Sequence, residues 1–343
     1  MSSQRDEELE EYRRAVEEDP RDPDAWAMLA YHLGEKAREQ SDFHRELELR
    51  QQEVSAYRKA LSLESGDPVA WTNFGLTVDE LADQEPDPIR RRQLQDEATD
   101  AYRRAVELDP GDAEAWTSLG FSLGMKADET SDPDLQRRFR EQEMDAYRRA
   151  IDADPADPTP WNNLAACLGE MADQETDPEL ARDFREQEIA GYQNAVAADP
   201  GFLRAWRGMA FTFARMAEEC GDPAESERLW ERTVEASRGA TAADPEDGQS
   251  WYLLAASLLS RAHTAGDAPD PEALAAAQRA AELGEDHYNL ACALARIGQI
   301  QEALRELEGC LERDEVDPEY LAEDPDWEAL RDDPRFQALL KRS

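Results

Sequence analysis

Six tryptophans at equal intervals constrain the fold more than any other feature of this sequence. Trp26, Trp71, Trp116, Trp161, Trp206 and Trp251 each lie 45 residues from the next. Five equal intervals indicate one structural unit used repeatedly, and a period in this range is typical of arrays in which each unit packs only against its neighbours. The 343 residues therefore predict one elongated array rather than two ordinary domains.

Each unit is predicted to consist of two antiparallel helices of about 18 and 21 residues. An Asp-Pro pair such as Asp67-Pro68 precedes the tryptophan, because aspartate caps a helix start and proline suits the first turn. After Trp116, apolar or small residues follow at helical spacing, and Gly120 keeps that face thin enough for close helix approach. The second helix is predicted to begin after a further series of aspartates: Asp42, Asp87, Asp132, Asp177 and Asp222.

These motifs resemble the tetratricopeptide repeat, whose pattern reads W-x2-L-G-x2-Y, then A-x3-F, then P. Trp116-x2-Leu119-Gly120-x2-Leu123 matches the first half, with leucine in place of tyrosine. Ala98-x3-Tyr102 and Pro110 match the second half in the preceding unit. The chain departs from the family in its period of 45 rather than 34 residues, and in three units that have glutamate at the small position: Glu53, Glu143 and Glu188.

The repeat and the resemblance together predict an all-α fold, a right-handed superhelical solenoid of antiparallel helix pairs. The tail contains Trp327 and Phe336, which we expect to cover the last unit as solenoids require. The predicted organisation is one array over residues 1–343: a cap helix at 4–20; five 45-residue repeats at 21–65, 66–110, 111–155, 156–200 and 201–245; a shortened sixth repeat at 246–284; an ordinary-length seventh repeat at 285–314; and capping helices at 315–343.

The charge balance excludes several partner classes. There are 79 acidic and 38 basic residues, so the formal net charge is −41. Such a surface repels phosphate backbones and anionic lipid, and we expect neither nucleic-acid nor membrane binding. Scarce lysine in so acidic a chain fits either a protein kept soluble at high salt or an ordinary acidic protein from a GC-rich genome.

No catalytic, cofactor-binding or metal-binding constellation is recognisable in the sequence, so we predict a protein that is not an enzyme. The four histidines form no HExxH motif, and the four cysteines form no CxxC motif. Cysteines in apolar helical stretches, with no apolar leader segment before them, predict a reduced cytoplasmic protein.

Positions that differ between units are the candidate binding residues. In the tetratricopeptide family the first helices line a concave groove, and the resemblance implies that Tyr31, Leu76, Phe121 and Phe211 face it, with Asn162 nearby. Aromatic side chains in such a row are good contact groups for a peptide. The alternative is that Phe121 and Phe211 pack against neighbouring helices.

The fifth unit carries a local reversal of charge sign. Arg204, Arg207, Phe211 and Arg215 are spaced 3, 4 and 4, so they share one helix face. Arginine forks bind carboxylates well, which suggests an acidic side chain or C-terminal carboxylate of a partner as the ligand. The alternative is pairing with the many acidic residues nearby, and surface pairs of that kind contribute only ~0–1 kcal/mol.

Three functions remain open at this stage. The first is a non-catalytic scaffold that binds a peptide or protein in its concave groove. The second is a self-associating structural or assembly factor. The third is an enzyme built on a helical-repeat scaffold, which no sequence motif supports. The oligomeric state is left open.

Overall fold

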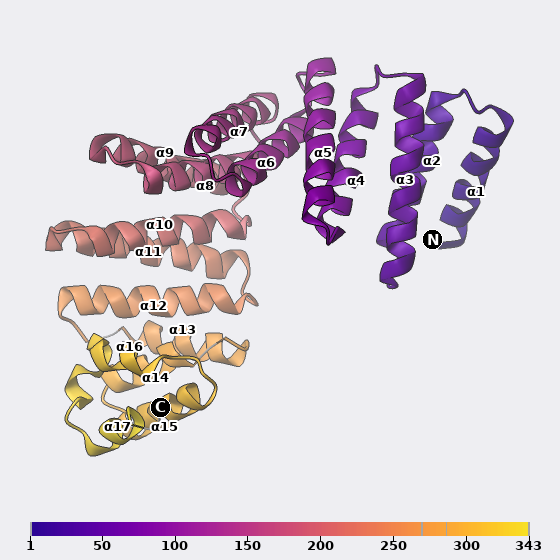
Figure 1. The fold of residues 1–343 in the computed structure, drawn as a ribbon. Helices are drawn as coiled ribbons and strands as arrows, with labels where there is room; N and C mark the ends of the chain where they lie inside the picture. The colour runs from indigo at the N-terminus through magenta and orange to yellow at the C-terminus, as the bar shows by residue number, and fades with distance from the viewer. Residues whose placement is uncertain (1, 269, 286, 342–343) are drawn as a thin grey trace. The chain divides into compact units, whose positions relative to one another are not determined.

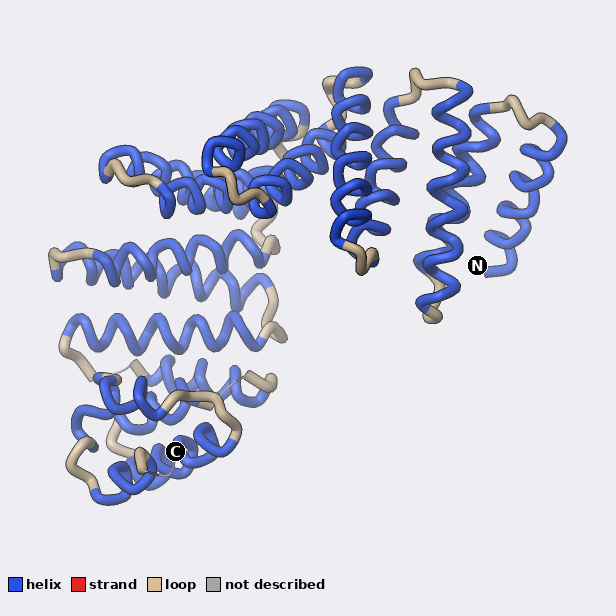
Figure 2. Tube along the Cα trace, in the orientation of Figure 1, coloured by secondary structure: helices blue, strands red, loops and turns tan. Residues whose placement is uncertain are grey.

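The computed structural model describes residues 2–268, 270–285 and 287–341, and all the regular secondary structure in these ranges is helical (Figures 1 and 2). The all-α prediction is therefore confirmed for the described chain. The chain divides into two compact units, residues 1–171 and 172–343. Residue 1 and residues 342–343 at the ends of the predicted array, and residue 286 in its predicted seventh repeat, lie outside the described residues.

The first unit is a series of helix pairs in which each helix packs against the next in sequence (Figure 1). The first helices of neighbouring pairs also contact one another, α2 with α4 and α4 with α6. These contacts place the three helices along one side of the unit. In order the helices are α1 (Ser2–Glu18), α2 (Pro23–Arg38), α3 (Phe43–Leu63), α4 (Pro68–Gln84), α5 (Pro88–Leu108), α6 (Ala113–Glu129) and α7 (Pro133–Ala153), and α8 (Pro158–Gln174) runs across the division between the units.

The second unit continues with consecutive pairs and ends in shorter helices. Trp327 and Phe336 stack with ring centroids 5.4 Å apart, and both are fully buried in the core that also contains α14 and α15. The elements are α9 (Pro178–Ala198), α10 (Leu203–Glu219), α11 (Pro223–Ala243), α12 (Gly248–Ala265), α13 (Pro271–Glu282), α14 (Tyr288–Arg296), α15 (Ile300–Glu312), α16 (Pro318–Glu323), the 3-10 helix η1 (Pro325–Leu330) and α17 (Pro334–Leu339).

Local sequence signals set the helix ends. The aspartates that the sequence predicts as N-caps of the second helices all have extended backbones, and each accepts a hydrogen bond from a backbone N–H of the first turn. Proline follows directly in all but one of these helices. The second helices of these five pairs have 21 residues each, as the sequence predicts, and the first helices α2 to α12 have 16 to 18.

The six periodic tryptophans are half-buried, and four of them pack against buried core residues: Trp26, Trp71, Trp116 and Trp251. Each indole N–H donates to the backbone carbonyl six residues earlier, in the loop that follows the preceding pair. An amphipathic ring with a polar N–H fits this place at the edge of a core. The six bonds run from Trp26 to Pro20, Trp71 to Ser65, Trp116 to Pro110, Trp161 to Pro155, Trp206 to Pro200 and Trp251 to Pro245, at 2.9–3.2 Å.

Glycines let the two helices of a pair approach closely. A Cβ atom added at Gly120 would lie 2.5 Å from a ring carbon of Tyr147, and one at Gly75 would lie 2.5 Å from the ring of Tyr102. Both tyrosines are almost fully buried. The prediction that Gly120 keeps its helix face thin is therefore confirmed.

Candidate partner-binding site

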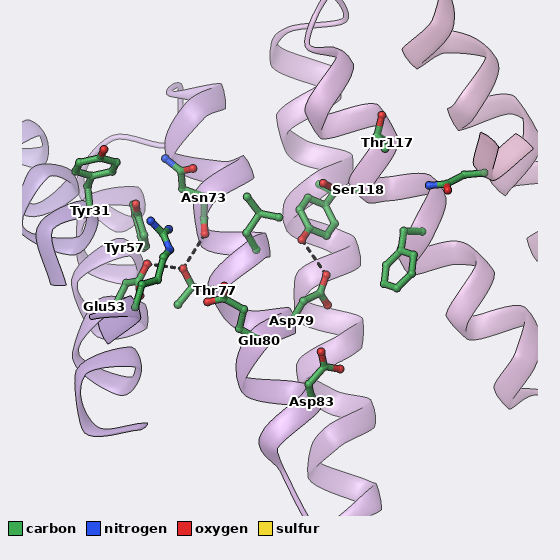
Figure 3. Close-up of a pocket in the computed structure, with 15 residues that line it drawn as sticks. Tyr31, Glu53, Tyr57, Asn73, Thr77, Asp79, Glu80, Asp83, Thr117 and Ser118 are labelled. Atoms are coloured by element: carbon green, nitrogen blue, oxygen red, sulfur yellow. Dashed lines mark hydrogen bonds between the residues drawn. The ribbon is translucent and has the colours of Figure 1, made fainter. Parts of the chain in front are cut away.

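Three of the predicted binding residues line one pocket of the first unit. Tyr31 on α2, Leu76 on α4 and Phe121 on α6 border a cavity of about 360 Å³ (Figure 3). Tyr31 is 46% exposed and Phe121 is 57% exposed, whereas Leu76 is half-buried. Large apolar side chains left open to water on neighbouring helices are a feature of interaction sites.

The floor of the pocket is polar. Tyr57 and Tyr102 are buried almost completely, yet both border the cavity, and the Tyr102 hydroxyl donates to Asp79 Oδ2 at 2.8 Å (Figure 3). The Thr77 hydroxyl donates to Glu53 Oε1 at 2.7 Å. The tyrosines come from the second helices α3 and α5, so both members of each pair contribute to the site.

The pocket is acidic. Four carboxylates and one cation border it: Glu53, Asp79, Glu80, Asp83 and Arg38. The pKa of Asp79 is raised to about 6, mainly by burial and in smaller part by the nearby Asp83, against the lowering effects of the Tyr102 hydrogen bond and the Lys126 charge. Burial likewise raises the pKa of Glu80, although Arg50 lies 2.8 Å from it. A carboxylate with a raised pKa is one whose negative charge is poorly compensated.

The glutamates at the small position of the family pattern form buried ion pairs, a role that the sequence reading missed. Arg50 lies 3.1 Å from Glu53 on α3, and both side chains are only 4% exposed. Arg140 lies 2.8 Å from Glu143 on α7 in the same way. In the second unit, α9 repeats the arrangement with Arg185 and Glu188 at 2.7 Å. The signal was present as Arg-x-x-Glu at corresponding positions of three units.

Glycine on the facing helix makes room for these buried carboxylates. A Cβ atom added at Gly34 would lie 2.4 Å from Glu53 Oε1, and one at Gly124 would lie 2.6 Å from Glu143 Oε1. Burial raises the pKa of both glutamates, and the paired arginine lowers it. Glycine on the first helix therefore leaves the space that the glutamate side chain of the second helix occupies.

The α4–α5 pair reverses that combination. Asp79 lies 45 residues after Gly34, and Ala98 lies 45 residues after Glu53. The carboxylate thus comes from the first helix and the small residue from the second. The pair has no arginine to match, because Gln95 occupies the position that corresponds to Arg50.

The arginine face predicted for α10 lies in the second unit. Arg204 and Phe211 are exposed, and Phe211 is 57% exposed. Arg207 Nη1 lies 3.7 Å from Asp247, its guanidinium donates to Gln249, and Arg215 Nη1 lies 2.7 Å from Asp173. Two of the three arginines thus contact polar or acidic residues of their own unit.

Asn162 on α8 is half-buried, and its Nδ2 donates to Asn163 Oδ1 at 3.2 Å. Asn163, and not the predicted Asn162, borders the pocket in the first unit. Successive residues of an α-helix are rotated by about 100°, so neighbouring residues such as Asn162 and Asn163 point in different directions.

One group of metal-ligand types comes together within the described ranges: Cys292, Asp324 and Asp326, with ligand atoms within 4.8 Å of one another. Its oxygens already have partners. Asp324 accepts from the Tyr288 hydroxyl at 2.5 Å and from the Asp326 backbone N–H at 2.8 Å, and Asp326 lies 3.3 Å from Arg296. The group holds the tail against α14 through these bonds.

Residues 287–317 match the family model of the tetratricopeptide repeat. The match covers α14 and α15, the pair closest to the family's ordinary length. No curated protein sequence matches the chain. None of the helices over the described ranges is long and apolar enough to cross a membrane.

Solved structures with the same kind of fold match most of the chain. The nuclear import adaptor Nro1 of S. pombe is 13% identical, with a TM-score of 0.55 over 77% of this chain and 95% of that one. A second Nro1 structure, described as a hypoxic regulator of sterol synthesis, gives 13% and 0.55 over 83% and 95%. YrrB, described as a TPR protein with an unusual peptide-binding site, gives 15% and 0.45 over 69% and 96%. At these identities the likeness concerns the fold alone.

Proposed function

Since this chain carries a tetratricopeptide repeat and is built of consecutive helix pairs, we propose that it is a non-catalytic scaffold that binds a protein or peptide partner. Folds of this type generally mediate protein–protein interaction. The proposed binding face in the first unit is the side formed by α2, α4 and α6.

One observation carries the proposal: apolar side chains from three successive first helices border a single pocket, and two of the three, Tyr31 and Phe121, are exposed. Tyr31 and Phe121 stand at its rim, and aromatic residues contribute disproportionately to protein interfaces because they bury large area at little entropic cost. Leu76 lies between them in the chain, so an extended segment of a partner could contact all three.

The second unit supports a separate contact through Arg204, Arg207, Phe211 and Arg215. Phe211 supplies an exposed ring, and Arg204 supplies an exposed cation. The pairs that Arg207 and Arg215 make are partly exposed, so their replacement by a partner's carboxylate would cost only about 0–1 kcal/mol each. We propose that this face receives an acidic side chain or a C-terminal carboxylate.

The proposal is tested by selecting peptides against the full chain from a displayed random library and measuring their affinity for matched variants. The Tyr31→Ala/Phe121→Ala double variant should bind pocket-directed peptides at least tenfold more weakly, since loss of an aromatic anchor typically costs ~1–2 kcal/mol or more. Phe43→Ala is the control, because Phe43 is 54% exposed but does not border the pocket.

If every selected peptide binds the double variant as tightly as the unaltered chain, the proposed face is wrong. Arg204→Gln and Arg207→Gln assign peptides to the second-unit face in the same way. Light scattering at several protein concentrations separates a monomeric scaffold from the self-associating alternative.

A further inference from the structure

The carboxylates that lie between paired helices, buried in three pairs and half-buried at Asp79, differ in whether an arginine of the chain contacts them. In α3, α7 and α9 an arginine three residues before the glutamate contacts it at 2.7–3.1 Å. Asp79, the corresponding carboxylate of the α4–α5 pair, receives a neutral hydrogen bond from Tyr102 instead. A neutral donor compensates a carboxylate less than a charged one does.

Two cations near the pocket, Lys126 and Arg38, form ion pairs with other carboxylates. The charge of Lys126 lowers the pKa of Asp79, and the Lys126 ammonium pairs with Asp96. Arg38, which borders the pocket, pairs with Glu35. Among the described residues no ion pair is formed by Asp79 or by Asp83, one helical turn further along α4.

Asp79 and Asp83 are nevertheless accessible to a ligand, because both border the same pocket as Tyr31 and Phe121 (Figure 3). The pocket therefore combines the exposed rings of Tyr31 and Phe121 with two carboxylates that form no ion pair among the described residues. A cation on an apolar stem complements both features, since its stem can lie against the rings and its charge can reach the carboxylates.

We propose that the pocket bordered by Tyr31, Asp79 and Phe121 receives a basic side chain, that of an arginine or lysine in the partner's peptide segment. This inference rests on the proposed function and names the chemistry of the partner. It makes the first unit selective for basic segments, whereas the arginine face of the second unit was proposed for an acidic group.

The basic side chain of the partner would supply the positive charge that a missing arginine does not supply in the α4–α5 pair. In the α6–α7 pair, Arg140 lies against Glu143 from within the chain. In the α4–α5 pair, the partner's cation would take the corresponding role beside Asp79. The Tyr102 hydroxyl holds the Asp79 carboxylate at the border of the cavity, so the acceptor is already oriented before the partner arrives.

The test uses acetyl-arginine amide as the probe and the Leu76 methyl resonances of the full chain as the reporter. Acetyl-citrulline amide is the neutral isostere, and 0.5 M KCl suppresses unspecific attraction of cations to a chain of charge −41. We expect saturable Leu76 shifts with the arginine probe and at least about tenfold weaker binding of the citrulline probe.

Asp79→Asn should weaken arginine binding about tenfold while leaving the citrulline probe unaffected. Asp100→Asn on α5 removes the same charge from an exposed position outside the pocket, and should bind like the unaltered chain. Asparagine keeps an acceptor for Tyr102; should this variant still fail to fold, Asp83→Asn tests the same claim at an exposed position.

Equal shifts with both probes, or unaltered arginine binding by the folded pocket variants, would overturn the inference. Failure here is distinguishable from failure of the proposed function. Selected peptides that depend on Tyr31 and Phe121 but contain no basic residue would keep the scaffold proposal and refute the basic-side-chain pocket.

Discussion

The α6–α7 and α4–α5 pairs share one backbone pattern, but the carboxylate between the helices comes from the second helix in α6–α7 and from the first helix in α4–α5. In α6–α7 the second helix supplies Glu143, which faces Gly124 and is compensated by Arg140. In α4–α5 the first helix supplies Asp79, opposite a second helix that has Ala98 at the corresponding position. In α6–α7 the chain itself supplies the positive charge beside the carboxylate. In α4–α5 the carboxylate lies at the border of a pocket.

This difference shows how a repeat protein can acquire a site without changing its fold. The small residue and the acid exchange helices between the two pairs. The loss of the matching arginine then removes the internal counter-charge. The two pairs thus differ at three corresponding positions: Gly124 and Asp79, Glu143 and Ala98, Arg140 and Gln95.

The largest expected effect is the loss of Arg140. Arg140→Met leaves Glu143 buried without its cation and should lower the free energy of unfolding by about 3–5 kcal/mol. Gln95→Met, at the corresponding position of α5, should change it by less than about 1 kcal/mol. Urea unfolding of both variants checks this, and equal losses would show that the two pairs do not differ as described.

The second effect concerns the pH dependence of stability that Asp79 causes. Burial raises its pKa from the ordinary 3.8 to about 6, so the folded chain binds a proton more readily than the unfolded chain between these values. Asp79 therefore lowers stability as pH rises from 4 to 6. The groups acting on it are Asp83, Lys126 and the Tyr102 hydroxyl.

Asp79→Asn should remove this dependence, so that the variant gains about 2 kcal/mol relative to the unaltered chain between pH 4 and pH 7. Thermal unfolding of both proteins over this range measures the difference. A difference that does not change with pH would place Asp79 in a well-compensated environment.

A smaller effect on the free energy of unfolding is expected at Gly124, the glycine that faces Glu143. Gly124→Ala places a Cβ atom 2.6 Å from Glu143 Oε1, and should destabilise the chain by about 1–2 kcal/mol. In a Glu143→Ala background, which imitates the small residue Ala98, the same change should cost almost nothing. A double-mutant cycle measures this coupling, and additive effects would contradict the claim that glycine and glutamate form one combination.

The smallest effect is expected in the second unit. Arg215→Gln removes a partly exposed pair with Asp173 and should change the free energy of unfolding by less than about 1 kcal/mol. It should nonetheless weaken binding of peptides that end in a free carboxylate. Fluorescence anisotropy with amidated and free-acid forms of one selected peptide distinguishes these effects, and equal binding of both forms would refute the acidic-group proposal.

The helix pairs and their starts could be predicted because they depend on local signals. An aspartate such as Asp132 before a proline defines a cap within four residues, and a stripe such as that of α6 defines a buried face within one helix. The sequence also placed Tyr31, Leu76 and Phe121 at equivalent positions of successive units, and the structure brings these three to one pocket.

The remaining features depend on contacts between helices, which the spacing within one helix does not contain. The ion pair of Arg140 with Glu143 lies within one helix, but its burial depends on Gly124 of the facing helix. The role of Asp79 appears only when its position is compared with Gly34 and Gly124 across units. The half-buried position of the tryptophan rings likewise depends on the hydrogen bond from the indole N–H to a loop carbonyl, which the apolar stripe does not contain.

The carboxyl resonance of Asp79, followed by NMR during a pH titration, tests the central difference between the two pairs most directly. The account predicts a pKa of about 6 in the free chain and a clear decrease with saturating acetyl-arginine amide, because a bound cation favours the charged carboxylate. A pKa near 3.8 in the free chain, or a raised value that the arginine probe leaves unchanged, would contradict it.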